Sequence, residues 1–470
     1  MKVTDKIKFG TDGWRAVIGD TYTVVNVGRV AEATAKWISQ SNNTSVLIGY
    51  DCRFNGKLFM ETAIKVFLHY DIKVYFAKNF VSTPMVSMGT RKYGAALGVI
   101  LTASHNPPEY GGFKLKSSFG GPLLPDKVQE VEDLIQDDFD RSMLNIDLDS
   151  AISKGTLVEL DLESEYVKAV QDNFDLNAIR NSGMKFAYDA MYGAGQNVMR
   201  RLFPNIELLH CEYNPSFKGQ APEPIARNLR ELETFLQEKK DIDIALVTDG
   251  DADRIGLYNG NGIFVDSHHI MLLLIHYMVK YKGLKGKVVT AFSSSPKIKK
   301  LCKHYGLEHE TVKIGFKYIA GLMVTEDVLV GGEESGGIAV KGHIPERDGI
   351  WMGMILWEFM AKSGKRLTEL IHEVYDIVGG FYFDRNDLHL DENLKQRIVE
   401  NCKNDKYTSF GDFKIQHIET IDGFKFYFDK EAWVMIRPSG TEPVLRVYAE
   451  AATMSEVQAI LKSTKETILN

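Results

Sequence analysis

The chain has 470 residues, of which 44% are hydrophobic and 25% are charged, and this length predicts two to four domains. Its net charge of −7 argues against nonspecific nucleic-acid binding, which depends on lysine and arginine contacts to phosphates. The longest apolar run, 270–275, is too short to cross a bilayer, and the first ten residues contain no apolar signal region. We therefore expect a cytoplasmic protein without a membrane partner, and the four scattered cysteines, which form no CxxC pair, indicate buried thiols.

The first part of the chain alternates predicted helices and strands. Amphipathic helices are predicted over 21–39 and 57–70, and buried strands over 45–51 and 73–77. This alternation is typical of a mainly parallel sheet. A further strand within 95–104 would end just before Ser104, at the edge where α/β sheets bind ligands.

The strand-then-loop pattern recurs in segments 184–195, 242–254 and 286–295, so three α/β units fit within residues 1–375. After about residue 378 the pattern changes to short alternating segments, with Asp422-Gly423 as a hairpin turn. A final helix is predicted over 455–469. This part predicts a small antiparallel α+β domain, with a hinge at 378–380.

The segment TASHNPPEYGGFK, residues 102–114, holds Ser104 on a stiff loop. A hydrolase elbow would need G-x-S-x-G, which is absent, and we expect the adjacent His105 not to reach Ser104 Oγ easily. The two prolines fix φ, and a rigidly placed hydroxyl suits phosphoryl transfer. Lys114 could return to the same point as a base or a phosphate contact. A turn without chemistry is the alternative.

The segment TDGDADRIG, residues 248–256, follows a predicted apolar strand. Asp249, Asp251 and Asp253 alternate in a segment that we expect to be extended, so their carboxylates would converge on Mg²⁺ or Mn²⁺. A calcium EF-hand would need glycine and glutamate where the chain has Arg254 and Gly260. A solvated acidic turn is the alternative, and beside a metal Arg254 would hold a phosphate.

Three other segments carry polar groups suited to a sugar phosphate. GGEESGG, residues 331–337, offers acceptors for sugar hydroxyls, and the following segment, 341–349, offers groups for substrate binding or proton transfer. RPSGTEP, residues 437–443, combines a guanidinium, hydroxyls and a glycine-based anion nest, and residues 8–20 place one arginine after a glycine turn. Each has a plain turn as its alternative. The candidate residues are Arg15, Glu333, Ser335, His343, Arg347, Arg437, Ser439, Gly440 and Thr441.

Together, and in this order, the motifs resemble those of the α-D-phosphohexomutase family over almost the entire chain. That family carries a T-[AG]-S-H-N-P phosphoserine loop, a D-G-D-x-D-R metal loop, a G-E-x-S-G-type sugar loop and an R-x-S-G-T phosphate loop. The resemblance implies three similar α/β domains with mixed sheets plus a C-terminal α+β domain around a central cleft. The implied domains are 1–155, 156–262, 263–377 and 378–470.

The resemblance also implies roles for individual residues. Ser104 would be phosphorylated in the resting enzyme, and Asp249, Asp251 and Asp253 would hold Mg²⁺ together with an oxygen of the phosphoserine. Lys114 would be the general base, and Glu333 and Ser335 would bind sugar hydroxyls. Arg437, Ser439 and Thr441 would bind the phosphate that is not reacting. Arg254 would lie beside the metal loop, and Arg15 and His105 would lie in the site. Lys313 and Lys317 are weaker candidates for substrate binding.

The reaction implied is transfer of the Ser104 phosphoryl group to a hexose monophosphate, which gives glucose 1,6-bisphosphate; after the sugar turns end for end, Ser104 takes the other phosphate back. "GGEESGG" and "HIPERDGIW" are similar to phosphoglucomutases, so glucose 1-phosphate/glucose 6-phosphate interconversion is expected. Where related sequences have a histidine after G-E-M-S-G, this chain has Gly337, so that role is either missing or taken by His343.

A phosphomannomutase or dual-specificity enzyme is the next alternative, followed by a phosphoglucosamine mutase. From another class, a metal-dependent phosphohydrolase would release free phosphate, and a non-enzymatic sensor would need only binding. The sugar loop and second phosphate loop argue against a hydrolase, and the intact Ser104 and aspartates argue against a sensor. We expect a monomer, with a dimer as the alternative.

Overall fold

The computed structural model describes residues 6–10, 12–429, 431–438 and 444–470. The chain forms two compact units. The N-terminal unit consists of Met1–Val289 and Gly315–Ile371, and the C-terminal unit of Thr290–Ile314 and His372–Asn470. Within the described residues, no helix has the length and apolar character needed to cross a membrane.

The first sheet of the N-terminal unit has six strands in the order β1-β5-β4-β2-β3-β6. β2 pairs in parallel with β3 and β4, whereas β5 pairs antiparallel with β1 and β4, so the sheet is mixed. β4 is buried along its whole length, as its continuous apolar sequence predicts. The strands are β1 (Trp14–Val17), β2 (Ser45–Tyr50), β3 (Lys73–Ala77), β4 (Leu97–Leu101), β5 (Tyr110–Ser117) and β6 (Leu157–Leu160).

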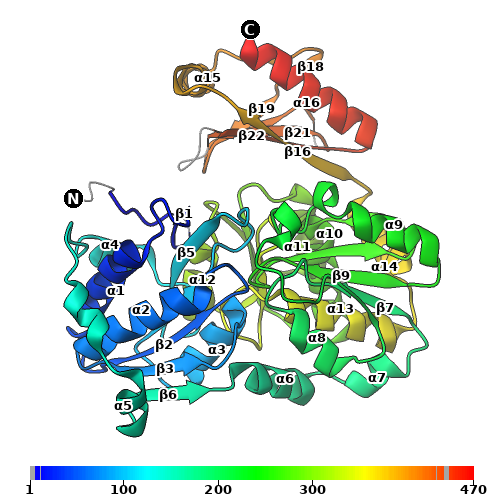
Figure 1. Ribbon diagram of the computed structural model, residues 1–470. Coiled ribbons are helices and arrows are strands. Elements are labelled where there is room, and N and C mark those ends of the chain that lie inside the picture. The colour runs from blue at the N-terminus through cyan, green and yellow to red at the C-terminus, as the bar shows by residue number, and fades with distance from the viewer. Residues whose placement is uncertain (1–5, 11, 430, 439–443) are drawn as a thin grey trace. The chain divides into compact units, whose positions relative to one another are not determined.

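The helices of this region alternate with the strands along the chain, and α1 packs along α2 beside the sheet (Figure 1). α1 begins at Thr23, whose side chain accepts a hydrogen bond from the Asn26 N–H and so caps the helix. The helices are α1 (Val24–Ile38), α2 (Gly56–His69), α3 (Thr83–Lys92), α4 (Pro125–Glu132), the 3₁₀ helix η1 (Arg141–Asn145), α5 (Leu148–Ser153), α6 (Leu162–Asn173) and α7 (Leu176–Arg180).

The second sheet has five strands in the order β11-β10-β9-β7-β8. β7 is parallel to β8 and β9, and β10 is antiparallel to β9 and β11, so this sheet is also mixed. The strands are β7 (Phe186–Asp189), β8 (Glu207–Leu209), β9 (Ile244–Thr248), β10 (Ile255–Asn259) and β11 (Phe264–Val265). The helical segments are α8 (Gln196–Leu202), η2 (Phe217–Gly219), η3 (Ala226–Asn228), α9 (Arg230–Lys239), α10 (Ser267–His276) and the π-helical turn η4 (Tyr277–Tyr281).

The rest of the N-terminal unit contains a β-hairpin and two helices. β14 (Val328–Gly332) pairs antiparallel with β15 (Ile338–Val340), and α12 (Phe316–Thr325) precedes them. α13 (Gly349–Ser363) packs closely on β9, because a Cβ at Gly353 would lie only 2.3 Å from Leu246. The chain passes between the two units three times: within β12 (Lys287–Ala291), between Ile314 and Gly315, and within α14 (Leu367–Val378).

The C-terminal unit contains a five-stranded sheet in the order β16-β22-β21-β20-β19, and every neighbouring pair is antiparallel. This confirms the predicted antiparallel C-terminal domain, and Asp422-Gly423 lie between the paired β19 and β20 as expected for a hairpin. Its strands are β13 (His309–Val312), β16 (Tyr382–His389), β17 (Ser409–Phe410), β18 (Phe413–Lys414), β19 (His417–Glu419), β20 (Phe424–Tyr427), β21 (Trp433–Pro438) and β22 (Val444–Ala451). Its helices are α11 (Pro296–Tyr305), α15 (Glu392–Lys403) and α16 (Met454–Leu469).

Candidate active site

Ser104 lies in the loop between β4 and β5 and is only 1% exposed. Its φ of 53° is in the left-handed region, which residues other than glycine rarely adopt. The expectation that His105 would not easily reach Ser104 was wrong, because His105 Nδ1 lies 3.3 Å from Ser104 Oγ. The left-handed turn at Ser104 accounts for this, since it lets two consecutive side chains face the same side.

Arg53 holds the Ser104 loop in place by binding its backbone carbonyls. Its Nη2 donates to the carbonyls of Ser104 and Asn106, both at 2.6 Å, and its Nη1 donates to those of Pro107 (2.7 Å) and Tyr110 (3.0 Å). The guanidinium is buried and fixed on its other side by an ion pair with a buried aspartate. The sequence analysis missed this arginine, because an arginine after a strand gives no local sign that it binds a loop about 50 residues away.

We expect Arg53→Lys to lower kcat by about 10²-fold with a smaller change in KM. A lysine ammonium cannot reach four carbonyls with the flat fork of a guanidinium, so the loop would lose its fixed position. The steady-state rate of the phosphoryl transfer expected from the sequence measures this effect.

Arg29→Lys is the matched control for that variant. Arg29 is also a buried arginine that donates to a backbone carbonyl, that of Gln136 at 2.6 Å, but it contacts no part of the Ser104 loop. A lower melting temperature with unchanged kcat is expected for the control. Equal losses of kcat in both variants would contradict the role assigned to Arg53.

The three aspartates of the metal loop converge, although their segment is not extended as predicted. Residues 249–253 form a turn in which the Ala252 N–H donates to the Asp249 carbonyl at 3.0 Å and Ala252 has a φ of 56°. Asp249, Asp251 and Asp253 are fully buried, and one oxygen of each lies within 4.8 Å of the others. An extended chain would hold alternate carboxylates further apart, so the turn is what concentrates the negative charge.

This carboxylate cluster fits a divalent metal ion. Buried carboxylate oxygens of Asp251 and Asp253 (Oδ1 in each) accept no hydrogen bond from the described residues, and an unsatisfied buried carboxylate oxygen is costly. Three hard oxygen donors are the set that Mg²⁺ prefers. Ser104 Oγ donates to Asp249 Oδ2 at 2.8 Å, so the serine lies at the edge of the same cluster.

Lys114, on β5, is a fully buried cation within the cluster. Its Nζ lies 2.8 Å from Asp251 Oδ2, 3.2 Å from Asp253 Oδ2 and 3.0 Å from Asp12 Oδ2. Burial alone would lower the pKa of Lys114, but these carboxylates raise it above its ordinary value. In turn the Lys114 ammonium lowers the pKa of Asp251, although burial opposes this. With these ion pairs formed, Lys114 is therefore an ammonium ion.

A second set of buried charges extends this cluster. Arg347 pairs with Asp12 and, at 2.8 Å, with Asp253, while Lys116 lies 2.8 Å from Glu346 Oε2. Arg347 was predicted from the sequence, whereas Asp12, Lys116 and Glu346 were not. Lys116 could have been found from the segment FKLK at 113–116, because lysines two residues apart on a strand, Lys114 and Lys116, point to the same face of the sheet.

Arg15 and Arg254 approach the Ser104 loop from two other elements. Arg15, on β1, donates to Asn106 Oδ1 at 2.6 Å. Arg254 Nη2 lies 3.5 Å from His105 Nε2, and its backbone N–H donates to Asp249 Oδ1 at 3.0 Å. The structure thus brings the predicted Arg15, His105 and Arg254 together with Ser104.

The sugar loop forms the turn between β14 and β15. Glu333 Oε1 accepts from the Gly315 N–H at 2.8 Å, and Ser335 is half-buried in the same turn. A Cβ at Gly337 would lie 2.5 Å from Arg347 Cδ, so the space that a histidine would need is filled by Arg347. His343 Nε2 lies 2.8 Å from Asp348 Oδ2, and the His343 ring stacks on Trp351 with the ring centroids 3.8 Å apart.

Burial raises the pKa of Glu333 from 4.5 to about 7, with Arg347 opposing and Glu334 adding to the shift. Because the folded state holds this proton more tightly, the resulting stability is complete below pH 4.5 and is lost as the pH rises through 7. This loss amounts to about 3 kcal/mol of the free energy of unfolding, and we expect Glu333→Gln to remove it. The melting temperature of the variant, relative to that of the wild type, should therefore rise between about pH 5 and pH 8. Glu159→Gln, at an exposed glutamate on β6, is the control. Parallel curves of melting temperature against pH for wild type and Glu333→Gln would contradict the assignment.

The remaining predicted residues lie in the C-terminal unit or outside the described residues, except Lys317, which lies in the N-terminal unit. Lys313 is exposed in the C-terminal unit, and Arg437, on β21, donates to Asp422 Oδ2 at 3.3 Å. Ser439, Gly440 and Thr441 lie outside the described residues. Lys317, on α12, lies in the N-terminal unit and lines a small cavity with Asp12.

Comparison with known proteins identifies the family. The chain matches the phosphoglucomutase/phosphomannomutase alpha/beta/alpha domains I (residues 6–141), II (164–262) and III (266–378), and the C-terminal domain (393–466). It is 27% identical to a phosphoglucomutase/phosphomannomutase of Thermococcus kodakarensis, over 97% of this chain and 96% of that protein. It is also 27% identical to a phosphoglucosamine/phosphogalactosamine mutase of Sulfurisphaera tokodaii, over 98% of both chains.

A crystal structure from Thermus thermophilus, provisionally assigned as a phosphomannomutase, superimposes with a TM-score of 0.87 at 31% identity, covering 99% of this chain and 100% of that one. These matches confirm the predicted fold class, three α/β/α domains with mixed sheets and a C-terminal domain with an antiparallel sheet. The chain belongs to the α-D-phosphohexomutase superfamily and is an intramolecular phosphotransferase of the phosphohexomutase type.

Proposed function

We propose that this chain interconverts glucose 1-phosphate and glucose 6-phosphate, with Ser104 as the phosphorylated residue and glucose 1,6-bisphosphate as the intermediate. One observation carries the proposal: Ser104 Oγ lies 2.8 Å from Asp249 Oδ2, at the edge of a fully buried cluster of three aspartates. A hydroxyl held there can carry a phosphoryl group next to a divalent ion. Mg²⁺ bound by Asp249, Asp251 and Asp253 would neutralise charge on the transferring group.

In the first half-reaction, the bond from phosphorus to Ser104 Oγ breaks while a bond to a sugar hydroxyl oxygen forms. The Arg53 contacts fix the Ser104 loop so that the two oxygens can lie in line with the phosphorus. The sugar hydroxyl must give up a proton, and Lys114 is the candidate base. Because an ammonium ion has no lone pair, Lys114 must first pass one proton to a neighbouring carboxylate such as that of Asp12, 3.0 Å away. Loss of its ion pairs with Asp251 and Asp253 would lower the pKa of Lys114 and so favour this step.

We further propose that Glu333 and Ser335 bind sugar hydroxyls and that Arg437, with the segment 439–441, binds the phosphate that is not reacting. Arg15, Arg254, His105 and Arg347 supply positive charge and hydrogen bonds around the transferring phosphate. Lys313, Lys317 and His343 are weaker candidates, and the contacts of His343 with Asp348 and Trp351 favour a structural role for it. The domain boundaries are proposed near residues 155, 262 and 377.

The preference for glucose rests on the G-E-E-S sequence of the sugar loop. Relatives at similar identity are named for glucose and mannose phosphates or for amino-sugar phosphates, so the sugar is what the test must decide. Initial rates on glucose, mannose and glucosamine 1-phosphates should be compared side by side, with trace sugar bisphosphate and Mg²⁺. We expect the highest kcat/KM with glucose 1-phosphate. A higher value for mannose or glucosamine would replace the sugar assignment, and free phosphate without isomer would favour a hydrolase.

A further inference from the structure

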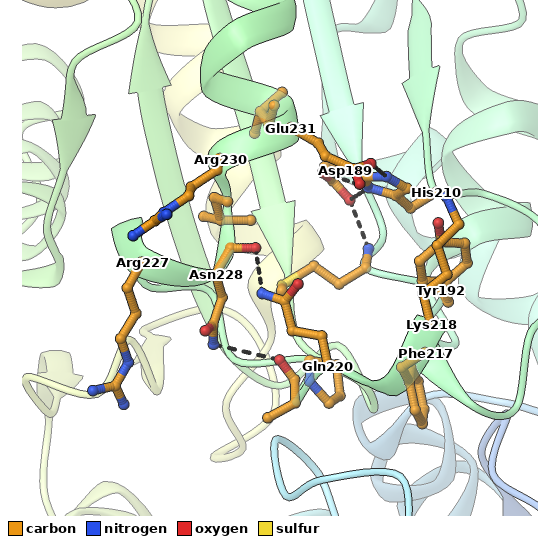
Figure 2. Close-up of a pocket in the computed structure, with 15 residues that line it drawn as sticks. Asp189, Tyr192, His210, Phe217, Lys218, Gln220, Arg227, Asn228, Arg230 and Glu231 are labelled. Atoms are coloured by element: carbon orange, nitrogen blue, oxygen red, sulfur yellow. Dashed lines mark hydrogen bonds and ion pairs between the residues drawn. The ribbon is translucent and has the colours of Figure 1, made fainter.

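A cavity of about 330 Å³ lies in the second α/β region, and its lining contains none of the residues assigned above to the active site. It is formed by the ends of β7 and β8, the segment 217–222 and the start of α9 (Figure 2). Figure 2 shows Asp189 and His210 at one side of it and Arg227 and Arg230 at the other. This volume suits a small metabolite.

The backbone around this cavity is strained. Five of its lining residues other than glycine have φ between 45° and 60°, in the left-handed region. Residues other than glycine adopt this region only at a cost in free energy, and strain of this kind concentrates in ligand clamps and switch regions. The five residues are Met191, Tyr192, His210, Phe217 and Lys218.

The lining carries an excess of positive charge. His210 lies between Asp189 and Glu231. Its Nδ1 is 2.9 Å from Asp189 Oδ2, and its Nε2 is 2.9 Å from Glu231 Oε2. Burial alone would lower the pKa of His210, but these hydrogen bonds raise it to about 9, so the imidazole is a cation at neutral pH. Lys218 and Arg230 are exposed at the rim, and neither forms an ion pair with a carboxylate of the described residues. Lys218 Nζ also lies 5.4 Å from the centroid of the Tyr192 ring. Figure 2 shows Lys218 and Arg230 on opposite sides of the cavity, so a cation without a carboxylate partner is available at each end of an anionic ligand.

The cavity wall also contacts the metal loop and the arginine that holds the Ser104 loop. Phe217 is buried, and its ring centroid lies 5.0 Å from the guanidinium carbon of Arg53, the residue that holds the Ser104 loop. Pro222 packs on the metal loop, because a Cβ at Gly250 would lie 3.0 Å from Pro222 Cγ and 2.5 Å from the Ser104 carbonyl oxygen. A shift of the strained segment 217–222 would thus be felt at Arg53 and at Gly250.

We propose that this cavity is a second binding site for a small organic phosphate, bound by Lys218 and Arg230, and that its occupancy alters the position of the Ser104 loop. Phosphate is favoured among anions because its oxygens accept bidentate hydrogen bonds from a guanidinium such as that of Arg230, while Lys218 on the opposite side can bind an oxygen at the other end of the ligand. The effect on the Ser104 loop rests on the proposed mutase function, whereas the binding itself does not.

The test is calorimetric titration of the full chain with glucose 6-phosphate, in Mg²⁺ buffer free of inorganic phosphate. We expect two binding events for the wild type and for the control Lys154→Glu/Lys465→Glu, which makes the same charge change as the double variant at two exposed lysines outside the cavity. The double variant Lys218→Glu/Arg230→Glu should keep one event and lose the other or weaken it by at least about tenfold. A single event in all three proteins would overturn the site.

A second readout follows His210 directly and does not depend on activity. In protein with ¹⁵N-labelled histidine, the His210 ring signals should shift on addition of inorganic phosphate in wild type and not in the double variant. Unchanged His210 signals in wild type at saturating phosphate would also overturn the site. If the second event and the His210 shift are present but no sugar phosphate is isomerised, the mutase proposal fails and the binding site stands.

Discussion

Ser104→Ala should abolish interconversion of glucose 1-phosphate and glucose 6-phosphate, with a loss of roughly 10⁴-fold or more in kcat. The variant removes the only atom of this residue that can carry the phosphoryl group, so the remaining groups have nothing to transfer. The side chain is buried, and its loss leaves Asp249 Oδ2 without the 2.8 Å hydrogen bond that it accepts from Ser104. A coupled assay for glucose 6-phosphate measures the loss.

Intact-mass analysis separates chemistry from folding in this experiment. Wild-type protein incubated with glucose 1,6-bisphosphate should gain the mass of one phosphoryl group, and Ser104→Ala should gain none. Ser118→Ala, at an exposed serine after β5, is the matched control and should behave as wild type in both assays. Full turnover by Ser104→Ala, or phosphorylation of that variant at another site with turnover retained, would contradict the assignment.

The alternation of strands and helices was readable from the sequence, because buried strands such as β4 and β9 are short apolar runs followed by polar loops. Antiparallel pairing in the C-terminal sheet was also predictable from alternating residues and the Asp422-Gly423 turn. The division of the chain into two compact units could not be predicted from the sequence, because residues 290–314 belong to the same unit as residues 372–470, which are far away in the sequence. Local patterns contain no information about such long-range packing.

The candidate site was predictable where several chemical groups share one loop, as in the three aspartates of residues 249–253. It was not predictable where a single residue acts across the fold. Arg53 and Asp12 are isolated in sequence, and only the folded chain brings them to the Ser104 loop and to Lys114. The turn at Ala252 was missed for a different reason, because a left-handed alanine has no sequence signature.

Removal of the divalent ion should stop turnover without unfolding the protein. In the structure, the Lys114 ammonium and the Arg347 guanidinium already pair with Asp251 and Asp253, so the buried negative charge is partly balanced when no ion is bound. EDTA-treated protein should therefore keep its circular dichroism and melt cooperatively, and Mg²⁺ should restore activity. Loss of folded structure on EDTA treatment would contradict this account of Lys114.

Asp251→Asn should weaken this metal site permanently. Asp251 supplies a buried carboxylate whose Oδ1 has no hydrogen-bond partner among the described residues, and an amide there is a weaker, uncharged ligand. We expect kcat to fall by about 10³-fold, equivalent to about 4 kcal/mol of transition-state stabilisation, and the Mg²⁺ concentration for half-maximal rate to rise. The control is Asp241→Asn. Asp241 is exposed and precedes β9, the strand that Asp251 follows. A purely structural role of Asp251 would lower stability without changing the Mg²⁺ concentration for half-maximal rate. An unchanged Mg²⁺ concentration for half-maximal rate in Asp251→Asn would therefore show that Asp251 is not a metal ligand.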